Sequence, residues 1–364
     1  MFEILFSGCR SGKFPLEYAR AHHGDRVTVH AYDAYQARKI REDVGAKSNV
    51  TVLCSDGLPD GACYDRAFYY ATSKLVSAEL ELDTLQDIHI HLKDGAQLFS
   101  DGVAPETLGK LFGKVESSRE SRRSPVKCVC VKKGELKRVR TFTASFEASV
   151  PGGPKLPFVS LPGCFCHRRP DEGGLALAEV VAAEQCLSEE LSVFGLDSTG
   201  IQNNPSTQTL KHSNTQCHSP FSILDIGCGC GLVGLLVADA LKRKGASDVS
   251  LALIDSHSRA IAAAKQNAAA LGFDADCILS DNGLPPDYPN MGKFHIALAN
   301  PPYYGEGRIA DLFAEIAAAS LAPDGVCWMV AKTPAIIQEA CGRCFKEVTA
   351  VKRRGYTVLR ATGS

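Results

Sequence analysis

The sequence has no long apolar segment and no excess of charge of either sign. Of its 364 residues 45% are hydrophobic and 22% charged, yet no run of 18 or more apolar residues occurs. A membrane-spanning helix needs about 20 such residues, so we expect no membrane anchor. The first residues lack the basic and apolar regions of a secretory signal, and we expect a cytoplasmic protein. The net charge is −1, so a binding surface for a charged partner requires an uneven distribution of charge.

A second close pair of cysteines at zinc-ribbon spacing is also missing. The chain has 15 cysteines, an odd number, and many of them lie in apolar, strand-like runs such as residues 126–131. Cys341 and Cys344 have the spacing of zinc ligands, but no partner pair accompanies them. We therefore interpret the cysteines as small buried hydrophobes and expect no metal site.

What the sequence does contain is an alternation of short apolar runs with helical patterns, typical of an α/β fold. In the second half, a buried-strand pattern at 221–227 enters a glycine turn, and a helical pattern follows at 232–242. A further helix is expected at about 175–194 and another at about 309–321, and later strands are expected at 326–331 and near 348–361. Together these patterns predict a Rossmann-like domain.

The first half repeats this plan. Strand-like runs end at Gly8, Asp33 and Asp56, much as later runs end at Gly227 and Asp255. We therefore predict two tandem Rossmann-like domains, at residues 1–150 and 151–364. The polar segment 196–219 is interpreted as a loop inserted in the second domain.

The clearest local signal is the turn after the strand at 221–226. Gly227, Gly229 and Gly231 follow Asp225 with the spacing G-x-G-x-G, and glycines let a backbone turn tightly and approach a ligand closely. A dinucleotide site would prefer G-x-G-x-x-G. A carboxylate beside the turn suits a cationic ligand without phosphate, and the pattern predicts S-adenosylmethionine.

Acidic and amide side chains end the next two strands. Asp255 lies 24 residues after Gly231, where a carboxylate could accept hydrogen bonds from both ribose hydroxyls. Asp281 or Asn282 ends the third strand and could reach the adenine edge. Their order at successive strand ends strengthens the prediction of S-adenosylmethionine.

The fourth strand leads into Asn300, Pro301, Pro302 and Tyr303. The prolines stiffen this loop and leave carbonyl groups outside any helix. Asn300 and the Pro301 carbonyl could accept the two hydrogens of an exocyclic amine, which would aim its lone pair at the sulfonium methyl. Tyr303 could stack on the planar group that carries the amine.

With these motifs in place, residues 221–364 resemble a class I methyltransferase with an NPPY motif. Leu161-Pro-Gly163-Cys-Phe165, followed by Asp171-Glu-Gly173, is similar to the segment preceding the catalytic core in the RsmC/RlmG-type ribosomal RNA guanine-N2 methyltransferases. The resemblance implies a guanine amine in ribosomal RNA as substrate, and an inactive first domain. His295, in place of an acid, and the sequence Tyr303-Tyr304-Gly305 depart from the family pattern.

The first domain lacks the catalytic motifs. Arg10 replaces the middle glycine of its turn, and residues 68–73 replace NPPY. Between Lys110 and Arg140 there are 11 Lys and Arg against 3 Glu, an excess of +8. We therefore expect this domain to hold RNA phosphates. The candidates are Arg122, Arg123, Lys132, Lys133, Lys137 and Arg138, and Lys352, Arg353 and Arg354 could extend the surface.

Three alternatives remain open at this point. The NPPY motif also occurs in methyltransferases that act on adenine N6 and on glutamine side-chain amides. A non-enzymatic RNA-binding scaffold is a more remote alternative. A monomer is expected. The duplicated α/β plan favours ribosomal RNA over a protein substrate, since glutamine-specific enzymes typically place one catalytic domain behind a small helical domain.

Overall fold

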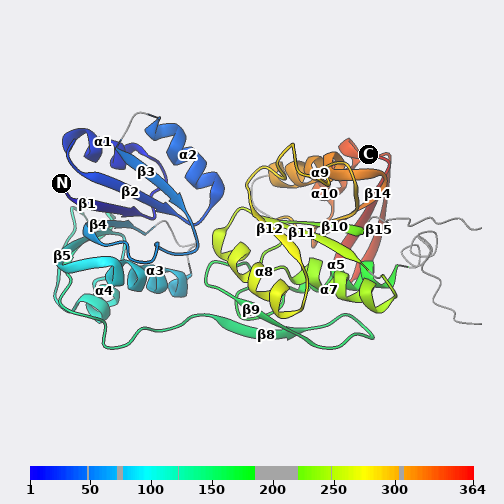
Figure 1. Ribbon diagram of the computed structural model, residues 1–364, viewed down its shortest axis with the longest axis horizontal. Helices are drawn as coiled ribbons and strands as arrows, with labels where there is room; N and C mark the ends of the chain where they lie inside the picture. The colour runs from blue at the N-terminus through cyan, green and yellow to red at the C-terminus, as the bar shows by residue number, and fades with distance from the viewer. Residues whose placement is uncertain (47–48, 72–76, 122, 185–219, 247, 303–306) are drawn as a thin grey trace, which may run out of the picture.

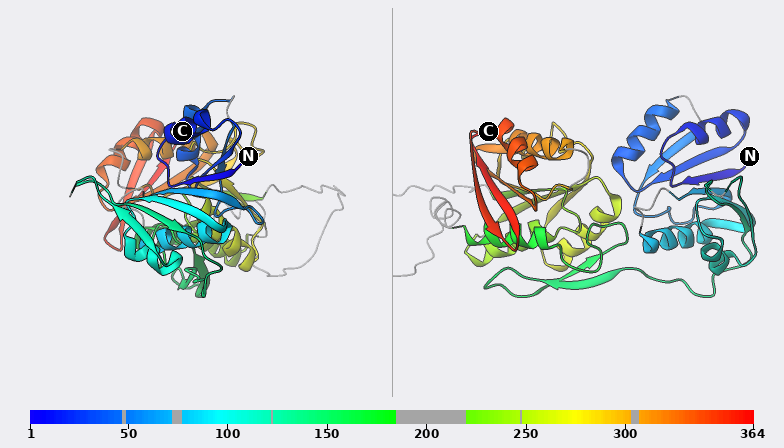
Figure 2. Two further views of the ribbon diagram at one scale, coloured as in Figure 1. Left: turned by 90° about the vertical axis from the view of Figure 1, so that its left-hand side faces the viewer. Right: turned by 180° about the vertical axis from the view of Figure 1, so that it is seen from behind.

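The computed structural model describes residues 1–46, 49–71, 77–121, 123–184, 220–246, 248–302 and 307–364. Two α/β units lie side by side (Figure 1), and the view from behind separates the same two lobes (Figure 2). None of the helices in these ranges combines the length and apolarity that a bilayer crossing requires.

The first unit is built on a seven-stranded sheet in the order β3-β2-β1-β4-β5-β7-β6. Strands β1 to β5 are parallel, whereas β7 runs antiparallel to both β5 and β6. Its elements are β1 (Glu3–Ser7), α1 (Lys13–Ala21), β2 (Arg26–Ala31), α2 (Ala34–Val44), β3 (Val50–Cys54), β4 (Tyr64–Tyr70), α3 (Ala78–His91), β5 (Leu92–Asp101), α4 (Pro105–Phe112), β6 (Val115–Ser118) and β7 (Lys127–Val131).

The second unit repeats this arrangement strand for strand, in the order β12-β11-β10-β13-β14-β16-β15. The shared order confirms the α/β class and the tandem repeat expected from the sequence. Its elements are α5 (Glu172–Ala183), β10 (Phe221–Ile226), α7 (Leu232–Arg243), β11 (Val249–Asp255), α8 (Ser258–Ala270), β12 (Ala275–Leu279), β13 (Phe294–Ala299), α9 (Arg308–Ser320), β14 (Leu321–Ala331), α10 (Ala335–Cys344), β15 (Glu347–Arg353) and β16 (Tyr356–Thr362).

Helices cover both faces of the second sheet. One core contains buried side chains of α5, α7 and α8, and the other contains those of α9 and α10. Neighbouring residues of β10 divide between them, since Ile223 packs into the first core and Leu224 into the second. Such two-sided burial explains why β10 carries apolar side chains on both faces, with Ser222 and Asp225 as its polar residues. Because β10, β11 and β13 are parallel, their carboxyl ends lie at the same edge of the sheet.

Two helices of the second unit differ from what the sequence predicted. Helix α10 was not predicted, and it places Cys341 in the core. The expected helix at 175–194 is represented by α5, which ends earlier than expected, at Ala183. Residues 185–194 and the proposed insertion at 196–219 fall outside the described residues.

A hairpin of β8 (Ala144–Ala148) and β9 (Leu156–Ser160) joins the units. Ala148, Val150 and Phe158 are buried in a core of the second unit, and Asn267 of α8 hydrogen-bonds the backbone of Val159. The expected boundary at 150/151 lies inside this hairpin. We propose instead that the second domain begins with β8.

The two units meet through equivalent loops. The backbone N–H of Ala34 donates to the Ser256 carbonyl and that of Ser258 donates to the Tyr32 carbonyl, both at 2.7 Å. These bonds frame an antiparallel bridge between Asp33 and His257. The loop that follows β2 is thus joined to the loop that follows β11, which carries Asp255.

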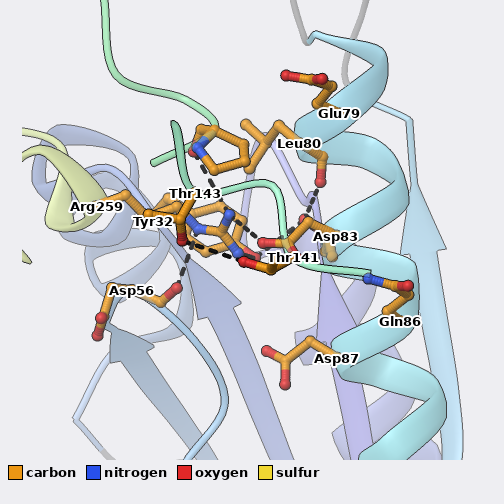
Figure 3. Close-up of polar contacts among 12 residues, drawn as sticks. Tyr32, Asp56, Glu79, Leu80, Asp83, Gln86, Asp87, Thr141, Thr143 and Arg259 are labelled. Carbon is orange, nitrogen blue, oxygen red and sulfur yellow. Dashed lines mark hydrogen bonds and ion pairs between the residues drawn. The ribbon is translucent and has the colours of Figure 1, made fainter. Parts of the chain in front are cut away.

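Arg259 of α8 reinforces this contact by reaching into the first unit (Figure 3). Arg259 is 4% exposed, and its guanidinium lies over the Tyr32 ring, with Cζ 4.5 Å from the ring centroid. It donates to Asp83 Oδ2 at 2.5 Å, to the Asp56 carbonyl at 3.0 Å and to the Tyr32 hydroxyl at 3.0 Å. A buried charge needs such partners, so the two units are docked by a specific polar contact.

Candidate active site at the edge of the second sheet

The glycine turn between β10 and α7 has two packed positions and one open one. Gly227, Gly229 and Gly231 all have positive φ, at 68°, 56° and 81°, a region that favours glycine. A Cβ on Gly227 would lie 2.8 Å from the Phe313 ring, and one on Gly231 would lie 3.1 Å from the Leu235 side chain. A Cβ on Gly229 would meet no heavy atom within 4 Å. Gly229 therefore faces the space in which a ligand could approach the backbone.

Asp225 lies beneath this turn. It is 3% exposed, and its Oδ2 accepts a hydrogen bond from Gly234 N of α7 at 2.8 Å. Burial raises the pKa of this carboxyl to about 7. Asp225 thus ties the strand to the helix, and its expected attraction for a cationic ligand stays a prediction.

Asp255 connects the end of β11 to the same turn. Its Oδ2 accepts a hydrogen bond from Gly229 N at 2.9 Å, and its Oδ1 accepts one from His257 N at 2.8 Å. Burial raises the pKa of this carboxyl above its ordinary value. The structure therefore brings together two of the residues that the sequence singled out, Asp255 and Gly229, in direct contact.

Asp281 has a partner that the sequence did not suggest. Arg38 of α2 in the first unit donates to Asp281 Oδ2 from both Nε, at 3.0 Å, and Nη2, at 2.7 Å. The side chain of Asn282 is exposed, and its Oδ1 accepts a hydrogen bond from Ser280 Oγ at 3.1 Å. Arg38 and Asp281 are 243 residues apart, and no local motif links them.

Asn300 follows β13, and its amide has a fixed orientation. Its Nδ2 donates to Asp171 Oδ2 at 2.7 Å, and the same oxygen accepts from Gly174 N at 2.6 Å as the N-cap of α5. Pro301 is buried and Pro302 half-buried, whereas Tyr303 lies outside the described residues. Asp171 was noted in the sequence only as part of a family-like segment. Its position before a helical run was the signal for a cap, but not for the contact with Asn300.

The equivalent edge of the first unit is closed by its own chain. A Cβ on Gly8 would lie 2.1 Å from the Tyr70 carbonyl oxygen, and the Phe14 ring stacks on the Tyr70 ring at 5.8 Å. Asp33, which corresponds to Asp255, caps α2 and accepts a hydrogen bond from Ser256 Oγ at 2.7 Å. This edge is used for packing and domain docking.

One of the expected RNA contacts is wrong. Lys132 is 3% exposed, and its Nζ donates to the Leu92 carbonyl at 2.9 Å and the Ile90 carbonyl at 3.3 Å. These carbonyls lie at the end of α3, where a cation is stabilised by the helix dipole. Lys132 is therefore a structural residue. Arg122 lies outside the described residues, and the exposed candidates are Arg123, Lys133, Lys137 and Arg138.

The basic residues near the C-terminus are largely neutralised by α5. Arg353 and Arg354 both pair with Glu179, at 2.5 and 2.7 Å, and Arg354 also pairs with Glu172 at 2.8 Å. Lys352 is exposed. These ion pairs leave less positive charge on this surface than the sequence suggested.

Comparisons with known proteins agree with this architecture. Residues 204–360 match the methyltransferase small domain. The protein YbxB of Bacillus subtilis is 29% identical over 144 residues, which are 38% of this chain and 68% of YbxB. The ribosomal RNA small subunit methyltransferase C of Pseudomonas entomophila is 26% identical over 236 residues. That alignment covers 63% of this chain but only 57% of the Pseudomonas protein, so more than a third of that relative is unmatched.

A solved structure shares the fold of the whole chain. It is the T. thermophilus 16S rRNA N2 G1207 methyltransferase (RsmC) in complex with AdoMet and guanosine. The TM-score is 0.70 at 20% sequence identity, covering 100% of this chain and 89% of that one. Residues 204–360 of this chain thus match the methyltransferase small domain, and the whole chain shares the two-domain fold of the RsmC structure.

Proposed function

We propose that the chain transfers a methyl group from S-adenosylmethionine to the exocyclic N2 amine of a guanine in ribosomal RNA. One observation carries the proposal: an oriented amide, Asn300, follows β13 at the edge of the sheet where Asp255 holds the open glycine, Gly229. The ribosomal RNA methyltransferase from Pseudomonas and the RsmC structure with AdoMet and guanosine support the choice of substrate.

The residues at this edge fit the cofactor. Open space at Gly229 lets a ligand approach the backbone. The Asp255 carboxylate is oriented by two backbone N–H groups, and its oxygens keep the capacity to accept ribose hydroxyls. We propose that Asp281 and Asn282 reach the adenine edge, with Asp225, Gly227 and Gly231 supporting the turn. When bound, S-adenosylmethionine supplies an electrophilic methyl group on a sulfonium sulfur.

The chain's own residues act by orienting the acceptor amine. Asp171 holds the Asn300 NH2, which turns the Asn300 carbonyl oxygen toward an incoming amine as an acceptor. With the Pro301 carbonyl, this oxygen would hold both amine hydrogens and aim the lone pair. The sequence places Tyr303 next, where its ring could stack on the base for about 1–3 kcal/mol. No strong base is required, because the amine loses its proton after transfer.

A base inside a duplex cannot reach this edge, so the nucleotide must be unpaired or flipped out. We propose that exposed basic residues of the first unit hold the surrounding phosphates. They are Arg123, Lys133, Lys137 and Arg138.

Adenine N6 and a glutamine amide are the competing acceptors, because they offer the same geometry of a planar group with an NH2. The two-lobed form favours RNA, since the first unit has Arg10 in place of the middle glycine of the turn and carries an exposed basic segment. A glutamine substrate would leave the exposed basic segment without a partner.

The test is incubation with methyl-labelled S-adenosylmethionine and either ribosomal RNA, assembled small subunits or total protein. We expect label in RNA, recovered as N2-methylguanosine after digestion to nucleosides and mass spectrometry. Label only in protein, or only in N6-methyladenosine, would overturn the assignment.

Calorimetry with the cofactor alone separates an enzyme from a non-enzymatic scaffold. We expect micromolar binding to the wild type and loss of binding in Asp255→Ala. Asp239→Ala provides a matched control, because this acid pairs with Arg243 on the surface of α7. Absence of cofactor binding to the wild type would favour the scaffold.

A further inference from the structure

The loop between β9 and α5 lies between the two units and ends at Asp171. Glu79 of α3, in the first unit, accepts hydrogen bonds from Arg168 Nε at 3.1 and 3.0 Å and from Nη2 at 2.8 Å. The same carboxylate lies 3.3 Å from His167 Nε2. A bidentate arginine–carboxylate pair fixes orientation as well as distance. The first unit therefore holds this loop by a directed contact.

The backbone of the loop has an unusual conformation that these contacts maintain. Cys166 and Arg168 have φ of 52° and 79°, although neither is glycine. Ser160 Oγ lies 2.8 Å from His167 Nδ1 and accepts a hydrogen bond from Arg168 N at 3.2 Å. Non-glycine residues adopt left-handed backbone conformations where the surroundings impose them, frequently at functional sites.

The end of the loop determines how Asn300 is presented. Asp171 accepts from Asn300 Nδ2 and Gly174 N through Oδ2, and from the Cys166 thiol through Oδ1 at 3.5 Å. A carboxylate accepts and does not donate, so only the NH2 side of the Asn300 amide can face it. A rotated amide would place its NH2 against the hydrogens of a substrate amine.

We propose that Asp171 is a positioning residue for Asn300, and that Glu79 makes the first unit part of the catalytic apparatus by holding the loop that carries Asp171. The inference rests on the function proposed above. It gives the first unit a role besides RNA binding: docking of the two units sets the orientation of the amide that receives the acceptor amine.

Two substitutions at residue 171 separate positioning from capping. Serine can cap α5 but is too short to reach Asn300, whereas asparagine can present a carbonyl oxygen to both partners. We expect Asp171→Ser to lower kcat by about 10- to 100-fold, with unchanged cofactor affinity and a melting temperature near the wild type. Asp171→Asn should recover most of the lost kcat. Equal activity of Asp171→Ser and wild type would overturn the proposal.

A double-mutant cycle then tests whether Asp171 acts through Asn300. In an Asn300→Ala background, adding Asp171→Ser should lower kcat by less than about 2-fold. A full additional loss in the double mutant would show that Asp171 acts elsewhere and would refute the positioning role.

The contribution of the first unit is measured with Glu79→Gln. We expect kcat to fall by about 3- to 10-fold, while the KM for RNA stays within about 2-fold. Glu106→Gln, which removes an exposed acid from α4 of the same unit, should match the wild type. A change confined to the KM for RNA would refute the proposed coupling. Methylation by the wild type is the common reference, so its absence would refute the proposed function instead.

Discussion

At the scale of single residues, we expect the buried carboxyl of Asp225 to couple cofactor binding to a proton. Its folded-state pKa of about 7 lies above the ordinary value of 3.8, because the site is desolvated. The folded protein without cofactor therefore binds a proton more tightly than the unfolded chain, and this contribution to stability is lost as the pH rises through about 7. A cationic ligand has the opposite preference, since it favours the carboxylate.

We therefore expect affinity for S-adenosylmethionine to increase as the pH rises from 6 to 8, with release of protons on binding. Calorimetry in two buffers of different ionisation enthalpy measures this release. Asp225→Asn keeps an acceptor for Gly234 N but removes the charge, so it should flatten the pH dependence. The same variant without cofactor should be about 1–3 kcal/mol more stable than the wild type at pH 8. Affinity independent of pH would contradict this role.

Two glycines of the turn offer a matched comparison. Gly229→Ala adds a methyl group to open space at φ 56°, so it should cost about 1–2 kcal/mol of stability but weaken cofactor binding at least 10-fold. Gly227→Ala places its methyl 2.8 Å from the Phe313 ring and should destabilise the fold more. Thermal melts and titrations with the cofactor distinguish the two. Equal cofactor affinity of Gly229→Ala and wild type would place the ligand elsewhere.

At the scale of elements, the sequence predicted the parts that depend on periodicity and strand order. The strands of the second sheet and the glycine turn follow from apolar runs with a turn signal, and they formed as expected. Helix α10 was missed, and its interior includes Gly342, a weak helix former. The contact of Asp171 with Asn300 was also missed, because it joins residues 129 positions apart that only the folded sheet brings together.

Lys132 shows where a count of charges fails. A basic run gives no information on which lysine turns inward to the carbonyls that end α3. We expect Lys132→Met to lower the free energy of unfolding by about 1–3 kcal/mol, because those carbonyls lose a charged donor. Affinity for RNA should not change.

The exposed basic residues should behave differently. The triple variant Lys133→Ala, Lys137→Ala and Arg138→Ala should reduce the slope of log affinity for RNA against log salt concentration by about 2, without loss of stability. Filter binding across salt concentrations, with thermal melts, checks both outcomes. A weaker RNA complex for Lys132→Met alone would reverse the assignment.

At the scale of the whole molecule, the repeat has produced two units with different uses of the same sheet edge. In the second unit, Asp255 at the end of β11 contacts the glycine turn. In the first unit, the corresponding residue, Asp33, contacts Ser256. Arg38 and Glu79 of the first unit also reach Asp281 and the loop before α5. Residues proposed for the cofactor and for the amide are thus supported from outside their own domain, so the two units should unfold as one.

Arg259 tests this cooperativity. Its guanidinium is buried between the units, and removing it would leave Asp83 without its partner and the Asp56 carbonyl without its donor. Losing one member of such a contact costs about 3–5 kcal/mol when both are fully buried, and less here because Asp83 retains 28% side-chain exposure. We expect Arg259→Met to lower the free energy of unfolding by about 2–4 kcal/mol.

Scanning calorimetry of Arg259→Met should resolve two transitions in place of one, because the docking that couples the units is weakened. Arg343→Met, which removes exposed ion pairs with Asp311 and Glu339 inside the second unit, should retain a single transition. A single transition in both variants would mean that the hairpin and the remaining loop contacts suffice to join the units.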